Sequence, residues 1–263
     1  MHRLRAGVLL PPSPRGPRAP GAGRVALTSD HVAGRAAEVR DRIAGAGGDV
    51  GRVRVVAVTK GFGPEAVAAA AGAGLLDVGE NYAQELVAKA EALAGRDREE
   101  GGAQEVRWHM LGTVQRNKVR RLAPLVALWQ AVDRITAGEA IAGHAPGAAV
   151  LVEVTLAGGA HRGGCAEGQV PALIAALGDL GLDVRGLMAV GPPGPPEGAR
   201  AGFRRLAKMA ADLGLPELSM GMTDDLEVAV QEGATMVRVG RGLFGPRPVH
   251  RDMRRLGSER GGV

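Results

Sequence analysis

The sequence predicts a single (β/α)8 barrel, a fold in which eight parallel strands alternate with helices. From Leu27 to about residue 249, short apolar runs alternate with helical stretches eight times, which indicates a parallel sheet. Eight repeats favour closure into a barrel over an open sheet. No glycine fingerprint of the G-x-G-x-x-G type follows the first strand, so a dinucleotide-binding fold receives no support.

The first half of the chain supplies a leading helix and four strand–helix units. The leading helix is expected over Ser29–Ala46, with Ser29 or Asp30 as its N-cap. The β-branched run Val53–Val58 is typical of a strand buried on both faces. Proline at the start of Pro64–Ala73 suits the first turn of a helix. The same alternation predicts strands at Leu75–Gly79, Val106–Leu111 and Leu128–Val132, and helices at Tyr82–Leu93, Gln115–Leu122 and Ile135–Ala142.

The second half continues the alternation with four more strands. They are expected at Ala149–Thr155, Val184–Val190, Glu217–Met220 and Met236–Val239. Helices are expected at Gln169–Leu180, Ala199–Leu213 and Asp225–Glu232, and the short segment GLFGP follows the last strand. We therefore expect the barrel to occupy residues 28–249. The basic leader over residues 1–27 is expected to be disordered, with a transit peptide as the alternative, and the tail over residues 250–263 is expected to be disordered as well.

The formal net charge of +5 is located in the leader. Residues 1–27 contain five arginines and no lysine or acidic residue, so residues 28–263 are formally neutral. A nucleic-acid-binding face is therefore not expected on the barrel. A role of the leader in binding a partner or a nucleic acid remains an alternative, which deletion of residues 1–27 would test. No apolar run approaches the length of a membrane helix, so no membrane association is expected.

The chain contains a single cysteine, Cys165. An intrachain disulfide is therefore impossible, which suits a reducing cytoplasm. A cysteine-rich zinc site is excluded as well, and we expect no metal site.

A lysine follows the first predicted strand, where barrels place their functional residues. Lys60 is one of only four lysines, against 29 arginines. A primary amine can lose its proton and condense with an aldehyde, whereas a guanidinium cannot. Partial burial at the barrel mouth would favour the neutral, nucleophilic amine. Lys60 is therefore a candidate for a Schiff base, although an exposed lysine at a strand end is the alternative.

The loops after strands seven and eight resemble a phosphate site, which barrels often build at this position. The first loop reads SMGMTDD over residues 219–225 and the second reads RVGRG over residues 238–242. Gly240 and Gly242 would let backbone amides approach an anion, and Asp224 and Asp225 suit a helix N-terminus. Two ordinary glycine-rich turns are the alternative.

Polar side chains within the strands need partners, because the barrel interior is apolar. Arg238, inside strand eight, could pair with a carboxylate such as Asp224 or could face a cofactor ring nitrogen. Asn81 and His109 also lie at strand ends, and each by itself is interpreted as structural.

These residues belong to stretches that resemble the pyridoxal phosphate homeostasis proteins, which share the barrel of the alanine racemase N-terminal domain. The resemblance covers nearly all of the predicted barrel. The matching stretches are VAVTK (56–60), GENYAQE (79–85), WHMLGTVQRNK (108–118), RGLMAV (185–190), SMGMTDDLEVAV (219–230) and TMVRVGRGLFG (235–245).

The resemblance implies that pyridoxal 5′-phosphate (PLP) forms a Schiff base on Lys60. It implies that Arg238 faces the pyridine nitrogen and that Asn81 lies near the ring. A permanently charged arginine keeps that nitrogen unprotonated, which makes the ring a poorer electron sink. The residues implied in the phosphate site, mostly through hydroxyls and amides, are Ser219, Gly221, Thr223, Gly240 and Arg241.

One departure from the family concerns Arg162, where many relatives carry a lysine. That lysine has been discussed as a second site for PLP transfer, and arginine cannot form a Schiff base. A relay of PLP through this position is therefore doubtful here, and the effect of Arg162 on PLP handling stays open.

Besides the possible role of the leader, three functions of the barrel remain in competition. The expected one is intracellular PLP homeostasis, in which a monomer with little or no catalysis buffers PLP or delivers it to apo PLP-dependent enzymes. An amino-acid racemase is disfavoured because racemases that share this fold take a tyrosine as their second base from an additional β-rich domain. The only tyrosine here is Tyr82, next to the end of the second strand, so a two-base mechanism lacks its second base. A barrel aldolase would share Lys60 and the phosphate loops but would bind no chromophore. The sequence identifies neither the recipient enzymes nor whether transfer is active, and it does not fix the oligomeric state.

Overall fold

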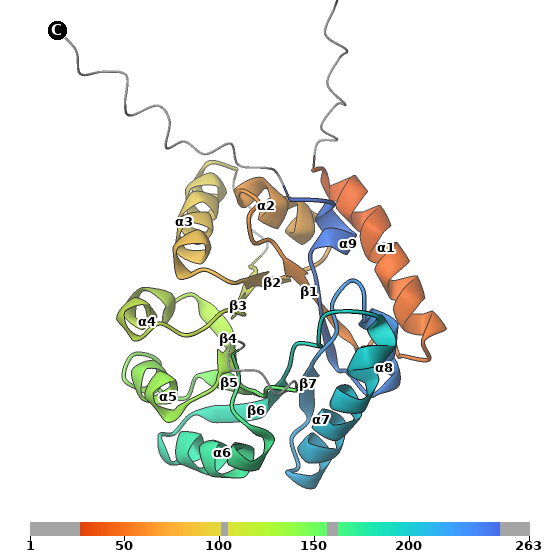
Figure 1. Ribbon diagram of the computed structural model, residues 1–263. Coiled ribbons are helices and arrows are strands. Elements are labelled where there is room, and N and C mark those ends of the chain that lie inside the picture. Colours follow the sequence, from red (N-terminus) through yellow and green to blue (C-terminus); the bar gives the residue numbers. More distant parts are fainter. Residues whose placement is uncertain (1–26, 101–104, 157–162, 248–263) are drawn as a thin grey trace, which may run out of the picture.

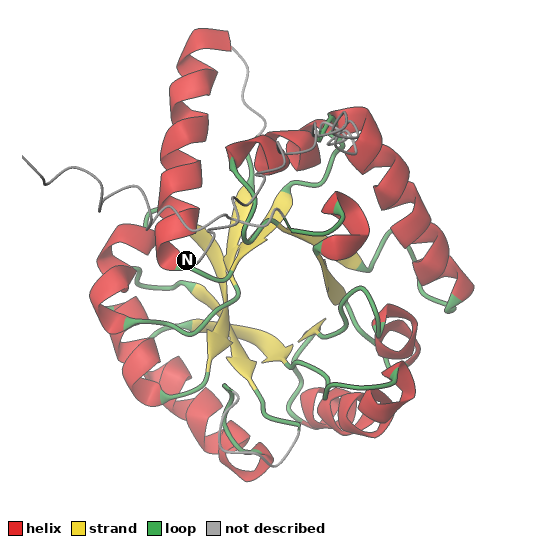
Figure 2. Ribbon diagram, turned by 45° about the horizontal axis from the view of Figure 1, so that its top comes forward, coloured by secondary structure: helices red, strands yellow, loops and turns green. Residues whose placement is uncertain are grey.

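A computed structural model describes residues 27–100, 105–156 and 163–247, and these residues form the predicted barrel (Figure 1). All eight strands are parallel and follow one another around a closed barrel, with β1 paired to both β2 and β8. The helices form an outer ring around the strands (Figure 2). The expectation of a (β/α)8 barrel is confirmed, with one additional helix before β1.

The strands are short and the helices between them differ in length. The strands are β1 Arg54–Val58, β2 Asp77–Glu80, β3 Arg107–Met110, β4 Val126–Val132, β5 Ala149–Glu153, β6 Asp183–Met188, β7 Glu217–Ser219 and β8 Met236–Val239. The α-helices are α1 Ser29–Gly45, α2 Pro64–Gly72, α3 Ala83–Glu100, α4 Arg116–Leu122, α5 Ile135–Ala142, α6 Val170–Asp179, α7 Arg200–Asp212, α8 Leu226–Gln231 and α9 Arg241–Phe244. Short 3-10 helices precede α6 at Glu167–Gln169 and α7 at Pro196–Ala199.

Differences from the sequence-based expectations concern element ends. The predicted N-cap of α1 is wrong: Thr28 caps the helix, because its hydroxyl accepts a hydrogen bond from the amide of His31. The helix after β2 runs on to Glu100 instead of ending at Leu93. Leu27, which was assigned to the leader, packs against the core. The rest of the leader and of the tail lies outside the described residues.

Side chains alternate between the inside of the barrel and the layer beneath the helices, as the two-residue period of a strand requires. On β5, Leu151 belongs to a small apolar cluster inside the barrel, while Val150 and Val152 belong to the large cluster beneath the helices. The inner cluster consists of Val56, Leu128, Ala131, Ala149, Leu151, Met188 and Met236. The barrel is therefore a filled core, and its functional surface lies at its ends. Within the described segments, no helix is both long and apolar enough to cross a membrane.

Candidate functional site

A cavity of about 730 Å³ opens where the strands end at their carboxyl termini. Its walls come from the ends of β1, β5, β6 and β8, from the loop after β7 and from the proline-rich segment 191–196. This volume lies within the range of about 300–1,000 Å³ that is usual for small-molecule sites. Lys60, Asn81, Thr223, Arg238, Gly240 and Arg241, all predicted from the sequence, line this one cavity.

Lys60 is the half-buried amine of this cavity. Burial lowers its pKa, and the nearby cations Arg247 and Arg238 lower it further. Both causes favour the neutral amine, because they raise the free energy of the charged form. The structure therefore places a primary amine in the cavity wall whose surroundings increase the fraction of its neutral, reactive form.

A buried cluster of polar groups holds the backbone on both sides of Lys60. Lys89, on α3, donates hydrogen bonds to the backbone oxygen of Thr59 at 2.8 Å and to the Glu80 carboxylate. The Thr59 hydroxyl donates to the same carboxylate at 2.6 Å, and Glu85 accepts a bond from the Gly61 amide at 2.8 Å. We call Thr59, Glu80, Glu85 and Lys89 the lysine clamp, because it fixes the turn that carries Lys60.

Arg238 is a cation buried inside the barrel with 5% of its surface exposed. Its guanidinium donates to the backbone oxygen and the hydroxyl of Ser219, both at 2.7 Å, and to the backbone oxygen of Ala189 at 2.8 Å. Burial lowers its pKa to about 10, so it remains charged at neutral pH. The predicted alternative of a pair with Asp224 is wrong, because Asp224 forms an exposed ion pair with Arg241 at 2.6 Å.

The loops after β7 and β8 meet at the cavity. The amide of Gly242 donates to the hydroxyl of Thr223 at 3.3 Å, which joins the two loops. Gly240 packs closely against β1, since a Cβ there would lie 3.0 Å from the backbone oxygen of Val58. Thr223, Gly240 and Arg241 thus surround one end of the cavity, where an anion could be bound.

Two residues predicted for the phosphate site have other roles in the structure. Ser219 is fully buried, and its hydroxyl lies between Arg238 and Gln130 instead of at the cavity. Gly221 adopts φ +88°, which favours glycine, and its backbone oxygen accepts a bond from the Arg238 amide. In the structure both residues support Arg238, and neither is among the described residues that line the cavity. Their contact with a phosphate group stays a prediction.

Asn81 lies at the cavity edge, beyond β2. The chain passes so close to it that a Cβ at Gly112 would meet the Asn81 backbone oxygen at 2.0 Å. Only glycine fits at position 112, because any side chain there would displace Asn81. The neighbouring Tyr82 is 60% exposed and contributes to a separate small cavity.

Glu153 was not predicted, yet it lines the cavity at the end of β5. Burial and the nearby Asp133 raise its pKa to about 7, against the opposing effect of Arg238. An inward position at the carboxyl end of a barrel strand is the signal that could have identified it from the sequence. Gln130 was not predicted either, and the signal for it is a polar residue within the apolar run of β4.

Replacing Glu153 by glutamine is expected to stabilise the protein at alkaline pH. Between about pH 4 and pH 7 the unfolded chain ionises Glu153 while the folded protein keeps it protonated, so stability falls as the pH rises through this window. Glu153→Gln should therefore raise the free energy of unfolding by about 1–3 kcal/mol at pH 8 and leave it unchanged near pH 4. Urea denaturation at both pH values measures this, with the exposed Glu139→Gln as control. An equal effect at both pH values would contradict the assignment.

Arg162 and the rest of the segment 157–162 lie outside the described residues, so the prediction on a PLP relay is not tested. Cys165 is free and buried, and burial raises the pKa of its thiol to about 11. Among the described residues, no group of three or more histidine, cysteine and acidic side chains is arranged to hold a metal ion.

Comparison with known proteins places the whole barrel in a defined family. The family model described as "Alanine racemase, N-terminal domain" matches residues 30–248. A Pseudomonas aeruginosa relative named "Pyridoxal phosphate homeostasis protein" is 39% identical over 227 residues, which cover 83% of this chain and 95% of the relative.

Solved structures agree with this placement. PipY of Synechococcus elongatus PCC7942, solved with PLP bound, is 30% identical with a TM-score of 0.70, over 81% of this chain and all of PipY. An alanine racemase from Corynebacterium glutamicum, 19% identical with a TM-score of 0.58, shares the fold over 84% of this chain and 62% of the racemase.

Proposed function

This chain belongs to the alanine racemase N-terminal-domain family and, within it, to the pyridoxal phosphate homeostasis proteins, and on that premise we propose that it binds PLP covalently through Lys60. Its role would be to buffer or deliver PLP inside the cell, in the cytoplasm and as a monomer, with apo PLP-dependent enzymes as recipients. The observation that carries the proposal is the half-buried Lys60 amine, with its lowered pKa, in the same cavity as Arg238.

The residues present fit PLP in three respects. PLP supplies an aldehyde that condenses with a neutral amine and releases water, together with a phosphate group and a basic ring nitrogen. Lys60 provides the amine, and the lysine clamp fixes its backbone. Thr223 and Gly240 surround a place for the phosphate. The guanidinium of Arg238 has five N–H bonds, and three of them donate to described protein oxygens. The remaining two can be offered to an acceptor atom in the cavity.

Little or no catalysis is expected from this arrangement. Arg238 stays charged at neutral pH, so it would hold the ring nitrogen by a hydrogen bond without protonating it, and a ring held in this way would withdraw electrons weakly. Tyr82, the only tyrosine, is exposed and is not among the described residues that line the main cavity. A tyrosine base of the racemase type is therefore not positioned over Lys60.

Weak amino-acid racemase activity is the second candidate, and Glu153 favours it. This carboxyl group lines the same cavity and has a pKa of about 7, so it could exchange a proton there near neutral pH. Loss of any measured racemisation in Glu153→Gln, with PLP binding retained, would support this candidate.

The test of the main proposal is an absorbance spectrum of the protein mixed with PLP, before and after borohydride. We expect a band near the visible edge that borohydride removes, and a stable PLP adduct on the peptide that contains Lys60, identified by mass spectrometry. A colourless protein, or an adduct on another lysine, would overturn the proposal. Racemase assays on the same sample separate a carrier from an enzyme.

A further inference from the structure

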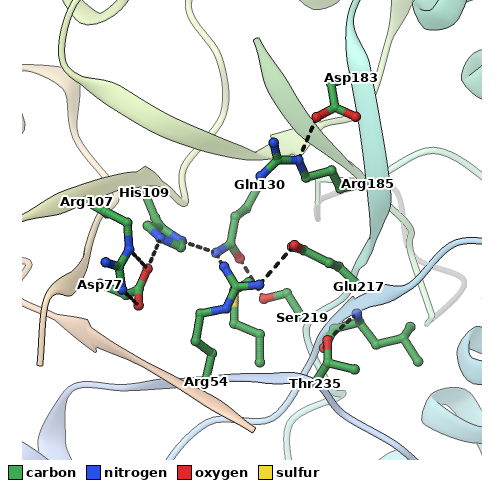
Figure 3. A network of polar contacts seen from close by, with 12 residues as sticks. Arg54, Asp77, Arg107, His109, Gln130, Asp183, Arg185, Glu217, Ser219 and Thr235 are labelled. Carbon is green, nitrogen blue, oxygen red and sulfur yellow. Dashed lines mark hydrogen bonds and ion pairs between the residues drawn. The ribbon is translucent and has the colours of Figure 1, made fainter. Parts of the chain in front are cut away.

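A row of buried polar side chains crosses the barrel interior beneath the cavity. Asp77 lies on β2, His109 on β3 and Gln130 on β4, while Ser219 and Arg238 lie on β7 and β8 on the other side of the barrel. Figure 3 shows the first four side chains arranged end to end. Each of the five has at most 5% of its surface exposed. We call these five residues the polar chain.

The hydrogen bonds of the polar chain run in one direction from donor to acceptor, and we call this direction its polarity. It is set at the Arg238 end, because arginine can only donate hydrogen bonds. Arg238 donates to the Ser219 hydroxyl at 2.7 Å, so the single hydroxyl hydrogen of Ser219 is directed to the Gln130 Oε1 at 2.6 Å. The amide nitrogen of Gln130 then faces the Nδ1 of His109 at 2.7 Å and the sulfur of Met236 at 2.9 Å. A flipped Gln130 would turn its oxygen toward that sulfur and its N–H groups toward a hydroxyl that already accepts from Arg238.

The other end of the polar chain is an acceptor, as this polarity requires. His109 Nδ1 accepts from Gln130, so the ring proton lies on Nε2, which faces the Asp77 Oδ1 at 2.9 Å. Asp77 also receives two hydrogen bonds from Arg107, at 3.0 and 2.6 Å. Although burial opposes its ionisation, the bonds from His109 and Arg107 hold the pKa of Asp77 well below its usual range. Every donor therefore meets an acceptor, in one direction from Arg238 to Asp77.

We propose that the polar chain positions Arg238, with Ser219, Gln130 and His109 as positioning residues that fix the guanidinium toward the cavity. A fixed direction matters because the described acceptors of Arg238 are neutral oxygens, so no carboxylate orients it directly. The inference rests on the proposed function insofar as the acceptor in the cavity is the ring nitrogen of PLP. The polarity itself does not depend on PLP.

The first test measures the polarity in the protein without PLP. Long-range ¹⁵N–¹H NMR of the histidine ring, assigned by its loss in His109→Asn, should show a neutral imidazole with its proton on Nε2. Gln130→Glu replaces the donor to Nδ1 by an acceptor, so His109 should then gain a second proton and show the imidazolium shifts. A wild-type proton on Nδ1, or an unchanged ring in Gln130→Glu, would overturn the assigned polarity.

The second test measures positioning through PLP release. Ser219→Ala interrupts the polar chain, and we expect PLP to dissociate about tenfold faster, since a hydrogen bond to a charged group is lost. Thr235→Val is the matched control: it removes a hydroxyl that bonds to the backbone of Leu218, outside the polar chain. The control should leave PLP release unchanged. Equal release rates in wild type and Ser219→Ala would contradict the positioning role.

The two tests separate the inference from the proposed function. A wild-type protein that takes up no PLP would refute the function while the NMR result still decides the polarity. PLP capture on Lys60 combined with an Nδ1 proton on His109 would refute the inference alone.

Discussion

Lys60→Ala is expected to abolish covalent capture of PLP. Alanine has no amine, so the borohydride-stable adduct should fall to background. The phosphate loops and Arg238 remain, and PLP should still bind reversibly with an affinity reduced by roughly 100-fold, or ~2.7 kcal/mol. Mass spectrometry after reduction measures the adduct, and fluorescence titration measures the affinity.

Lys208→Ala is the matched control for this variant. Lys208 lies on α7, is mostly exposed and pairs only with Asp212 among the described residues. Its replacement should leave both the adduct and the affinity unchanged. An adduct of wild-type yield in Lys60→Ala would show that a different amine captures PLP.

Lys89→Met is expected to cause the largest loss of stability among single changes near the site. The side chains of Lys89 and Glu80 are only 5% and 0% exposed, so the variant leaves a buried carboxylate without its cation. Breaking a buried pair in this way costs about 3–5 kcal/mol of unfolding free energy. The Gly61 and Thr59 backbone contacts would loosen as well, so PLP capture should slow.

The pH dependence of this loss identifies its cause. Burial already raises the pKa of Glu80, although Lys89 and Thr59 oppose that effect, and removal of Lys89 should raise it further. The unfolded chain ionises this group above about pH 4, so the deficit should grow from pH 4 to pH 8. Urea denaturation at both pH values measures this.

Two companion variants complete the experiment. The double variant Glu80→Gln/Lys89→Met should recover much of the loss, because no buried charge then remains. Lys208→Met, at an exposed pair, should cost at most about 1 kcal/mol. A deficit in Lys89→Met that is independent of pH and persists in the double variant would point to packing instead of charge.

The sequence predicted the barrel and Lys60 because both depend on local patterns. Alternating apolar runs identify the strands, and the end of a barrel strand identifies the site. The contacts of Ser219 could not be predicted in the same way, because a residue at a strand end can face the cavity or a neighbour inside the barrel, and the sequence does not distinguish these. Ser219 turns toward Gln130, which lies 89 residues away in the chain.

The lysine clamp was missed for a related reason. Nothing in the sequence around Lys89 shows that α3 brings this lysine against Glu80 behind the strand. The polar chain joins residues from β2 to β8, and such contacts depend on how the strands are staggered around the barrel. Periodicity predicts which residues share a face, whereas the stagger decides which of them meet.

The alternation of side chains along β1 limits how this segment can change in length. The side chain of Thr59 points outward to Glu80 of the lysine clamp, beneath the helices, and that of Lys60, one residue later, points to the cavity. Inserting or deleting one residue within Arg54–Val58 would exchange these two positions and carry the amine out of the cavity. Added residues in the turn before β1, where Val50 is 47% exposed, would leave both positions in place. Natural length variation around Lys60 should therefore occur before the strand and not within it.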